Sequence, residues 1–169
     1  MGSAEELVDI VDEHDDVVRT VTRAEVRRGR LRHRGVFVAV LTSRDELVIH
    51  QRSPLKDIWP SYWDIGAGGV VAAGETYEQS AVRELLEELG IEAPLVTLGK
   101  SYYEDDEVAL FGRGFVAVHD GPYEFRDGEV SAIEIVSLER FDAIFPERQW
   151  CPDSIALALP LLRAHMTSR

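Results

Sequence analysis

The chain has 169 residues, of which 45% are hydrophobic and 29% charged, an ordinary composition for one globular domain over residues 1–169. Its formal net charge of −13 argues against binding to nucleic acid polymers or anionic membranes, although a bound cation could still attract a nucleotide. No apolar run reaches the ~20 residues that span a bilayer, and the acidic start lacks a signal-peptide core. The single cysteine, Cys151, excludes an internal disulfide. We therefore expect a cytoplasmic protein.

The first part of the chain is predicted to be mostly strand. Apolar runs bounded by turn residues indicate strands at Leu7–Val11, Val17–Thr20, Val36–Thr42 and Leu47–Gln51. The run Val36–Thr42 is almost continuously apolar, which is typical of a strand buried on both faces. We expect a helical turn at Thr22–Val26. The segment Ser53–Tyr62 contains Pro54 and Pro60, so it is expected to be a loop.

The best-defined helix follows a glycine-rich loop that runs from Gly66 to Gly74. Thr76 is followed three residues later by Gln79, and this capping box begins the helix. Gly90 is a C-cap glycine that ends it. Residues spaced at the helical period form an apolar stripe. The stripe consists of Ala81, Val82, Leu85, Leu86 and Leu89.

The second half of the chain alternates strands and helices. Strands are expected at Leu95–Tyr103, Val108–Val118 and Ala132–Val136, the first two joined by an acidic hairpin. Ser137–Phe141 is predicted to be a cap and a short helix. A C-terminal helix is expected over Asp153–His165, interrupted by Pro160. This order of elements indicates an α+β or α/β layered domain.

Three glutamates of the central helix stand close together. Glu84, Glu87 and Glu88 are at i, i+3 and i+4, so their side chains are neighbours, on the side that we expect opposite the apolar stripe. Ionised carboxylates this close repel one another, and Mg²⁺ or Mn²⁺ would relieve the repulsion because these cations prefer oxygen ligands. A metal beside a glycine loop is typical of sites that act on phosphates. The alternative is an ordinary solvated helix face.

The stretch from Gly69 to Ile91 resembles the Nudix box, whose pattern is G-x5-E-x7-R-E-U-x-E-E-x-G-U with U an apolar residue. The matching residues are Gly69, Glu75, Arg83, Glu84, Leu85, Glu87, Glu88, Gly90 and Ile91. The resemblance implies an α/β/α sandwich around a mixed β-sheet. It also implies a hydrolase dependent on Mg²⁺ or Mn²⁺ that cleaves a nucleoside diphosphate linked to another moiety, X.

The same resemblance implies roles for individual residues. The metal-ligand candidates are Glu84, Glu87, Glu88 and the backbone carbonyl of Gly68. Arg83 would orient the glutamates through an ion pair and Glu75 would support the loop. Glu88 is the favoured general base, and a carboxylate of a later loop is the alternative. The later carboxylates are Glu104, Asp105, Asp106, Glu107 and Glu129, with Glu107 and Glu129 preferred.

Other residues are predicted to contact the substrate. Arg52 and Lys56 precede the glycine loop, and with Gly68 and Gly69 they are the expected binding residues for phosphate. Aromatic residues just before the loop either stack on a flat group or pack in the core; they are Trp59, Tyr62 and Trp63. Seven arginines lie in one short segment and either contact phosphates or a second subunit, or simply solubilise the chain. They are Arg19, Arg23, Arg27, Arg28, Arg30, Arg32 and Arg34.

Outside the box, the chain is similar to isopentenyl diphosphate isomerase and its hydrolase-like bacterial relatives, in stretches such as LRHRGVFVAV and CPDSIALAL. The isomerase itself needs a cysteine just before the first glycine of the box and a histidine just after it, where this chain has Gly68 and Val70. A non-catalytic nucleotide-binding module is a further alternative, against which the complete glutamate set argues. The expected partner is a small-molecule diphosphate, and a homodimer is compatible with the resemblance.

Overall fold

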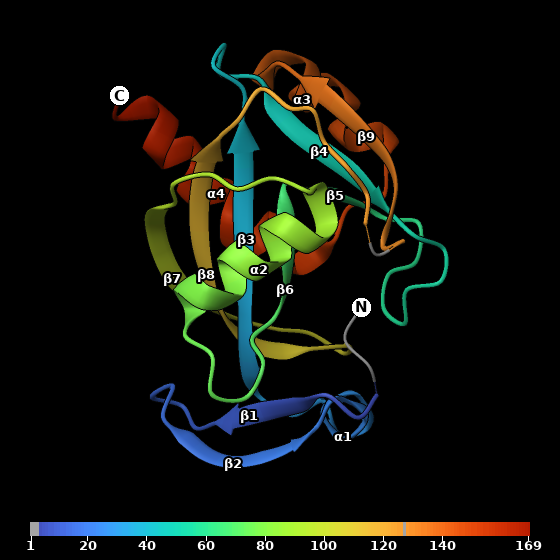
Figure 1. Cartoon of the computed structure of the whole chain (residues 1–169), viewed down its shortest axis with the longest axis vertical. Helices are drawn as coiled ribbons and strands as arrows, with labels where there is room; N and C mark the ends of the chain where they lie inside the picture. Colours follow the sequence, from blue (N-terminus) through green and yellow to red (C-terminus); the bar gives the residue numbers. More distant parts are fainter. Residues whose placement is uncertain (1–3, 127) are drawn as a thin grey trace.

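The computed structural model describes residues 4–126 and 128–169 (Figure 1). In chain order the elements are β1 (Leu7–Val11), β2 (Val17–Thr22), α1 (Arg23–Gly29), β3 (His33–Leu41), β4 (Leu47–Arg52), β5 (Trp63–Ile65), β6 (Ala67–Val70), α2 (Tyr77–Leu89), β7 (Val96–Glu104), β8 (Ala109–Val118), β9 (Val130–Val136), α3 (Leu138–Ile144), the 3-10 helix Phe145–Glu147 and α4 (Pro152–Thr167). Each predicted strand and helix is present, with ends that differ by a few residues.

The main sheet is mixed and is built around β3. In the described residues it has seven strands, with the order β5-β4-β3-β8-β7, while β6 pairs with β3 and β9 pairs with β4. β3 runs parallel to β8 and antiparallel to β6. β3 and β4 are paired only next to their hairpin, at Leu41 and Leu47. Beyond that pair β4 diverges, and β6 takes its place beside β3.

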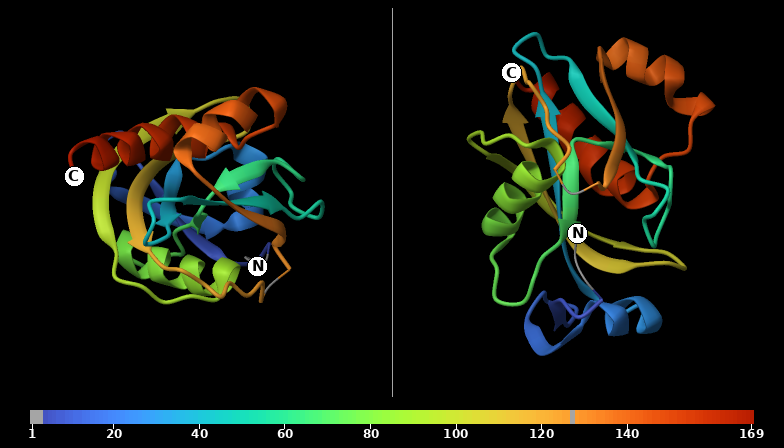
Figure 2. Two further views of the ribbon diagram at one scale, coloured as in Figure 1. Left: turned by 90° about the horizontal axis from the view of Figure 1, so that it is seen from above. Right: turned by 45° about the vertical axis from the view of Figure 1, so that its right-hand side comes forward.

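Helices cover both faces of this sheet, as the left view of Figure 2 shows. The side chains of β3 alternate between two cores, because successive residues of a strand point to opposite faces. Phe37, Ala39 and Leu41 belong to the core under α3 and α4, whereas Val36 and Val38 belong to the core under α2. The predicted α/β/α sandwich is therefore confirmed.

The N-terminal segment, residues 4–31, forms a separate unit of β1, β2 and α1 at the lower end of the molecule in Figure 1. Thr22 and Glu25 form a capping box at the start of α1, in which each side chain accepts a hydrogen bond from the other's backbone N–H. Val8, Ile10 and Val26 pack against Val70 of β6. This contact places the segment beside the glycine-rich part of the chain.

Three local predictions were wrong. Part of the expected glycine loop is strand β6, since the divergence of β4 leaves the edge of β3 free to pair. α4 continues through Pro160, which lies on the exposed side of the helix. Val82, assigned to the apolar stripe of α2, is 49% exposed. Among the described residues, no helix combines the length and apolar character needed to cross a membrane.

Candidate functional site

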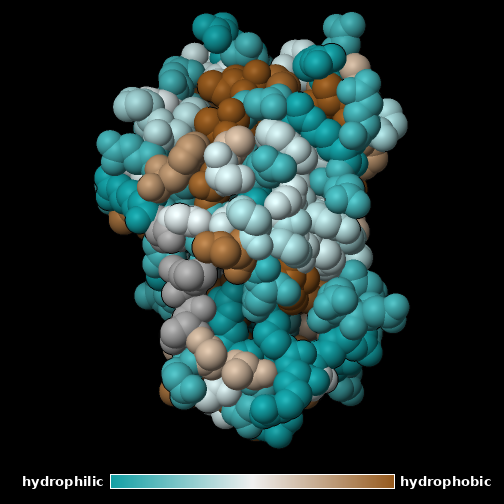
Figure 3. Space-filling view, turned by 90° about the vertical axis from the view of Figure 1, so that its right-hand side faces the viewer, coloured by the Kyte–Doolittle hydropathy of each residue, from teal (hydrophilic) through white to brown (hydrophobic). Residues whose placement is uncertain are grey.

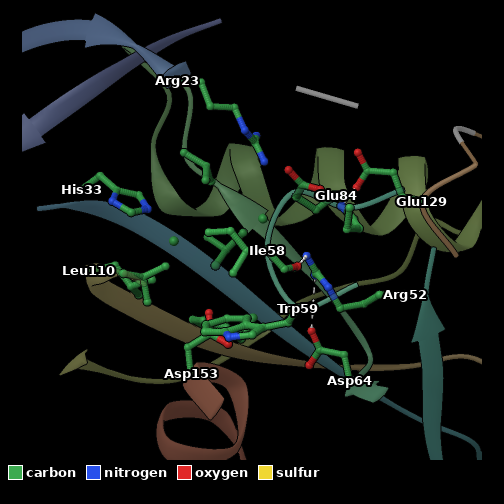
Figure 4. A pocket seen from close by; sticks show the side chains of 18 of the residues that line it. Arg23, His33, Arg52, Ile58, Trp59, Asp64, Glu84, Leu110, Glu129 and Asp153 are labelled. Carbon is green, nitrogen blue, oxygen red and sulfur yellow. Dashed lines mark hydrogen bonds and ion pairs between the residues drawn. The ribbon is translucent and has the colours of Figure 1, made fainter. Parts of the chain in front are cut away.

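A cavity lies where α2, β3 and the loop 53–62 meet the N-terminal segment. It encloses about 770 Å³, including space open to solvent. Hydrophilic side chains dominate the face in Figure 3, with a few apolar areas among them. Figure 4 shows charged side chains on opposite sides of the cavity, with Arg23, Glu84 and Glu129 on one side and Asp64 and Asp153 on the other. The apolar Ile58, Trp59 and Leu110 lie nearby.

The glutamates of α2 do not form a solvated face. Glu84 is 7% exposed and Glu88 only 1% exposed, while Glu87 is half-buried. The buried side of α2 carries these carboxylates next to Ala81, Leu85 and Leu89. The prediction that the glutamates lie opposite the apolar stripe was therefore wrong, because at 100° per residue positions 84 and 88 fall beside positions 81, 85 and 89.

Two glycines of β6 allow these carboxylates to approach the backbone. A β-carbon at Gly69 would lie 2.7 Å from Glu84 Oε2 and nearer still to Oε1. The backbone N–H of Gly68 donates to Glu88 Oε2 at 3.0 Å. A β-carbon at Gly68 would lie 2.6 Å from the carbonyl oxygen of Val36. Any larger residue at either position would displace the carboxylates or the strand.

Arg83 connects the glutamates of the box. Its Nε and Nη2 donate to the two carboxylate oxygens of Glu75 at 2.9 and 3.0 Å, a bidentate pair. Its Nη1 donates to Glu84 at 2.7 Å and to Glu87 at 3.3 Å, and its Nη2 also donates to the carbonyl of Val70 at 3.2 Å. Glu75 in turn accepts from the loop backbone at Ala72. This arrangement can orient the glutamates.

Burial disfavours the charged forms of Glu84 and Glu88. Burial raises the pKa of Glu84 to about 7, although Arg83 opposes the shift. Burial and the neighbouring Glu84 raise the pKa of Glu88 well above its ordinary value, against the opposing effects of Lys56 and the Gly68 N–H. Two buried carboxylates that repel each other make a place where additional positive charge would be stabilising.

The donor chemistry of this place fits a hard divalent cation. Carboxylate oxygens are the ligands that Mg²⁺ and Mn²⁺ prefer, and the glycines bring backbone close to them. Within residues 4–126 and 128–169, however, no three His, Cys, Asp or Glu side chains form a ready-made ligand set. Arg83 contacts both Glu84 and Glu87. The predicted ligand set, with Gly68, stays a prediction.

The predicted phosphate-binding cations both line the cavity. Lys56 Nζ forms an ion pair with Glu129 and lies 3.9 Å from Glu88 Oε1. Arg52 Nη2 donates to the carbonyl of Ile58 at 3.0 Å. Its Nε is buried and has no hydrogen-bond partner among the described residues. Such a donor is suited to an anionic ligand oxygen.

Of the carboxylates considered as alternative bases, the structure places Glu129 at the cavity. Glu104, Asp106 and Glu107 are exposed on the hairpin between β7 and β8, and none of them is a lining residue of the described cavity. Asp105 caps that hairpin by accepting from the backbone N–H groups of residues 107 and 108. Glu107 therefore lies outside the described cavity, whereas Glu129 lines it and Glu88 lies beside the lining residue Lys56.

Sequence reasoning missed Asp64 and Asp153, which line the cavity near Trp59 (Figure 4). Burial and the neighbouring Asp64 raise the pKa of Asp153 to about 7. In the sequence, Asp153 is an ordinary acidic residue in the first turn of a helix, so no local pattern indicated that it lines a cavity. Of the three aromatic residues, Trp59 lines the cavity, whereas Trp63 packs against the core and Trp150.

The N-terminal segment also reaches the cavity. Arg23 and Arg27 of the arginine-rich stretch line it, together with Glu6. Arg34 instead forms a structural pair with the buried Asp15, donating from Nε at 2.7 Å. The arginine-rich stretch therefore contains residues that line the cavity and a residue that forms an ion pair away from it.

Comparison with known proteins agrees with this geometry. The profile of the NUDIX domain matches residues 31–157. The chain is 38% identical to an uncharacterized Nudix hydrolase of Pseudomonas aeruginosa over 155 residues, 91% of this chain and 92% of that protein. It is 37% identical to the uncharacterized Nudix hydrolase YfcD of Escherichia coli K12 over 160 residues, 94% of this chain and 88% of YfcD. The crystal structure of DR0079 from Deinococcus radiodurans superposes with a TM-score of 0.76 at 27% identity, covering 94% of this chain and 98% of DR0079. This chain therefore belongs to the Nudix family and is a Nudix hydrolase.

Proposed function

We propose that this hydrolase uses Mg²⁺ or Mn²⁺ to cleave the diphosphate linkage of a nucleoside diphosphate attached to a moiety X. The observation that carries the proposal is the pair of buried carboxylates, Glu84 and Glu88, beside two glycines that admit no β-carbon. Glu84 and Glu88 would hold the cation, with Glu87 at the rim and the Gly68 carbonyl. A cation bound there would neutralise the carboxylates and would make the attacking water more acidic.

Side chains of the protein would bind the substrate and accept the proton. Lys56 and the buried Arg52 would hold the diphosphate oxygens, and the unsatisfied Nε of Arg52 is one donor for them. Water attacks one phosphorus, the bridging P–O bond breaks, and a nucleoside monophosphate and phosphorylated X leave. Glu88 would accept the proton of the attacking water, and Glu129, paired with Lys56, is the alternative acceptor.

The test is a screen of diphosphate compounds with Mg²⁺ or Mn²⁺ that measures both products, followed by Glu88→Gln. We expect this variant to lose turnover by about 10²- to 10⁴-fold and to remain folded. Glu78→Gln is the matched control, because Glu78 is exposed on the same helix and pairs with Arg113 at the surface. Full activity of Glu88→Gln would sink the assignment of Glu88.

Three further predictions belong to this proposal. Residues 1–169 would form one domain, which the packing of the N-terminal segment on Val70 supports, and the protein would be cytoplasmic. Similarity to the isopentenyl diphosphate isomerase branch would be one of descent rather than activity, since Gly68 supplies a backbone N–H where the isomerase needs a thiol. Light scattering in solution, which measures the molar mass, would test whether the chain forms a homodimer.

A further inference from the structure

Helix α1 places two arginines one turn apart at the cavity. Arg23 and Arg27 are at i and i+4, so their side chains lie on the same face of the helix. Both line the main cavity, and both also line a second, outer cavity of about 690 Å³, including space open to solvent. Lys56 and Glu129 line both cavities as well. These four residues therefore lie at the boundary that the two spaces share.

Three cations lie at this boundary in a chain of net charge −13, and each is paired with a carboxylate. Arg23 donates from Nη1 to Glu6 at 3.2 Å, and Arg27 donates from Nε to Asp57 at 3.1 Å. Among the described residues, these are the side-chain hydrogen bonds that each guanidinium makes. A guanidinium has five N–H donors in a fork that matches phosphate oxygens, so most of the donors stay available to a ligand. In Figure 4, Arg23 extends into the cavity from the N-terminal segment, on the side of Glu84.

These arginines lie apart from the residues proposed for hydrolysis. Arg23 and Arg27 precede residue 31, where the match to the Nudix domain begins, whereas Arg83 and the glutamates of α2 lie within it. The moiety X of a Nudix substrate must be recognised by residues outside the box, because a shared fold carries many specificities. The N-terminal segment supplies such residues at the edge that the inner cavity shares with the outer one.

We propose that Arg23 and Arg27 select substrates that carry a further phosphate beyond the cleaved linkage. This inference rests on the proposed function, which puts the diphosphate beside Glu84 and Glu88. Atoms that extend from there toward the outer cavity pass Arg23, Arg27 and Lys56. A phosphate at that point accepts hydrogen bonds from both guanidinium groups. It is either the terminal phosphate of a nucleoside triphosphate or a phosphate on a ribose of a dinucleotide.

The experiment compares matched substrate pairs. ATP and ADP differ by a terminal phosphate, and NADPH and NADH differ by a ribose phosphate. The ratio of kcat/KM within each pair is measured for the wild type, for Arg23→Gln and for the control Arg28→Gln. Arg28 is exposed on the same helix and is not a lining residue of either described cavity.

We expect the wild type to prefer the phosphorylated member of at least one pair by about 10- to 100-fold, the range for charge-assisted hydrogen bonds. Arg23→Gln should lower that ratio to about 1, and Arg28→Gln should keep it. The pair that shows the preference identifies the source of the phosphate. An unchanged ratio in Arg23→Gln, or an equal fall in Arg28→Gln, overturns the inference.

A binding measurement separates this inference from the proposed function. If the wild type hydrolyses none of the compounds, the proposed function fails, and calorimetry with the non-cleavable α,β-methylene analogues of ATP and ADP still tests the arginines. Tighter binding of the triphosphate analogue that disappears in Arg23→Gln supports the inference. Equal affinities for the two analogues overturn it. Thermal unfolding of each variant verifies that the loss of the Glu6 pair leaves the fold intact.

Discussion

The backbone of Gly69 lies against the carboxylate of Glu84, with space for a hydrogen but none for a β-carbon. Glu84 cannot easily move away, because Arg83 Nη1 donates to it at 2.7 Å and its side chain is buried. Gly69, which opens the box, and Glu84 are therefore packed against each other as one unit.

Gly69→Ala should destabilise the protein by about 1–3 kcal/mol, the usual effect of overpacking a tight site. The free energy of unfolding in urea measures this. In a Glu84→Ala background the clash is absent, so the same substitution should change the unfolding free energy by less than about 0.5 kcal/mol. Equal destabilisation in both backgrounds would show that Gly69 is required for a different reason, such as the pairing of β6 with β3.

Arg83→Lys should lower kcat/KM for the best diphosphate substrate by about 10- to 100-fold. The charge is retained, but an ammonium cannot make the bidentate pair with Glu75 while also holding Glu84 and Glu87. Arg113→Lys, at a surface pair with Glu78, is the control and should leave kcat/KM unchanged. Wild-type activity in Arg83→Lys would contradict an orienting role.

Addition of Mg²⁺ to chelator-treated protein should raise the unfolding free energy by about 2.7 kcal/mol at a concentration 100 times the dissociation constant. Glu84→Gln and Glu88→Gln should each remove this stabilisation, because they remove carboxylate donors. Glu78→Gln should retain it. The readout is thermal unfolding, which is independent of turnover, and a Mg²⁺ effect of equal size in all variants would place the cation elsewhere.

Stability should fall as the pH decreases from about 6.5 to about 4, because of His33. Its side chain is 2% exposed, and burial lowers its pKa to about 4, although the carbonyl of Leu31 interacts with Nδ1 at 2.8 Å. Between these pH values the unfolded chain binds the proton and the folded chain does not, so protonation favours unfolding. The contribution is about 3 kcal/mol, present above pH 6.5 and absent below pH 4.

His33→Asn tests this pH dependence, since asparagine does not titrate and can still donate to the carbonyl of Leu31. Urea unfolding at several pH values between 4 and 7.5 should give a flatter profile for the variant than for the wild type. Parallel profiles would assign the acid sensitivity to other groups, of which the buried His50 is the first to examine, because its pKa is also lowered by burial.

Local chemistry determined much of this protein from its sequence. Helix α2 begins at the capping box of Thr76 and Gln79 and ends at Gly90, as expected. Such ends are predictable because the free backbone groups of a helix end are paired by residues within a few positions. The continuous apolar run of β3 identified a strand buried between two layers of helices. The spacing of Glu84, Glu87 and Glu88 predicted the candidate site, since a helical repeat makes them neighbours in any environment.

Only the tertiary structure decided what surrounds that site. The helical spacing puts Glu84 and Glu88 beside the apolar residues of α2, but the extent of their burial depends on the sheet that packs against the helix. The Lys56–Glu129 pair joins residues 73 positions apart, and Asp153 reaches the cavity from the start of α4. Arg23 and Arg27 reach the cavity because Val8, Ile10 and Val26 dock on Val70. Each contact joins distant parts of the chain, so packing brings them together, whereas local propensity fixes only the elements.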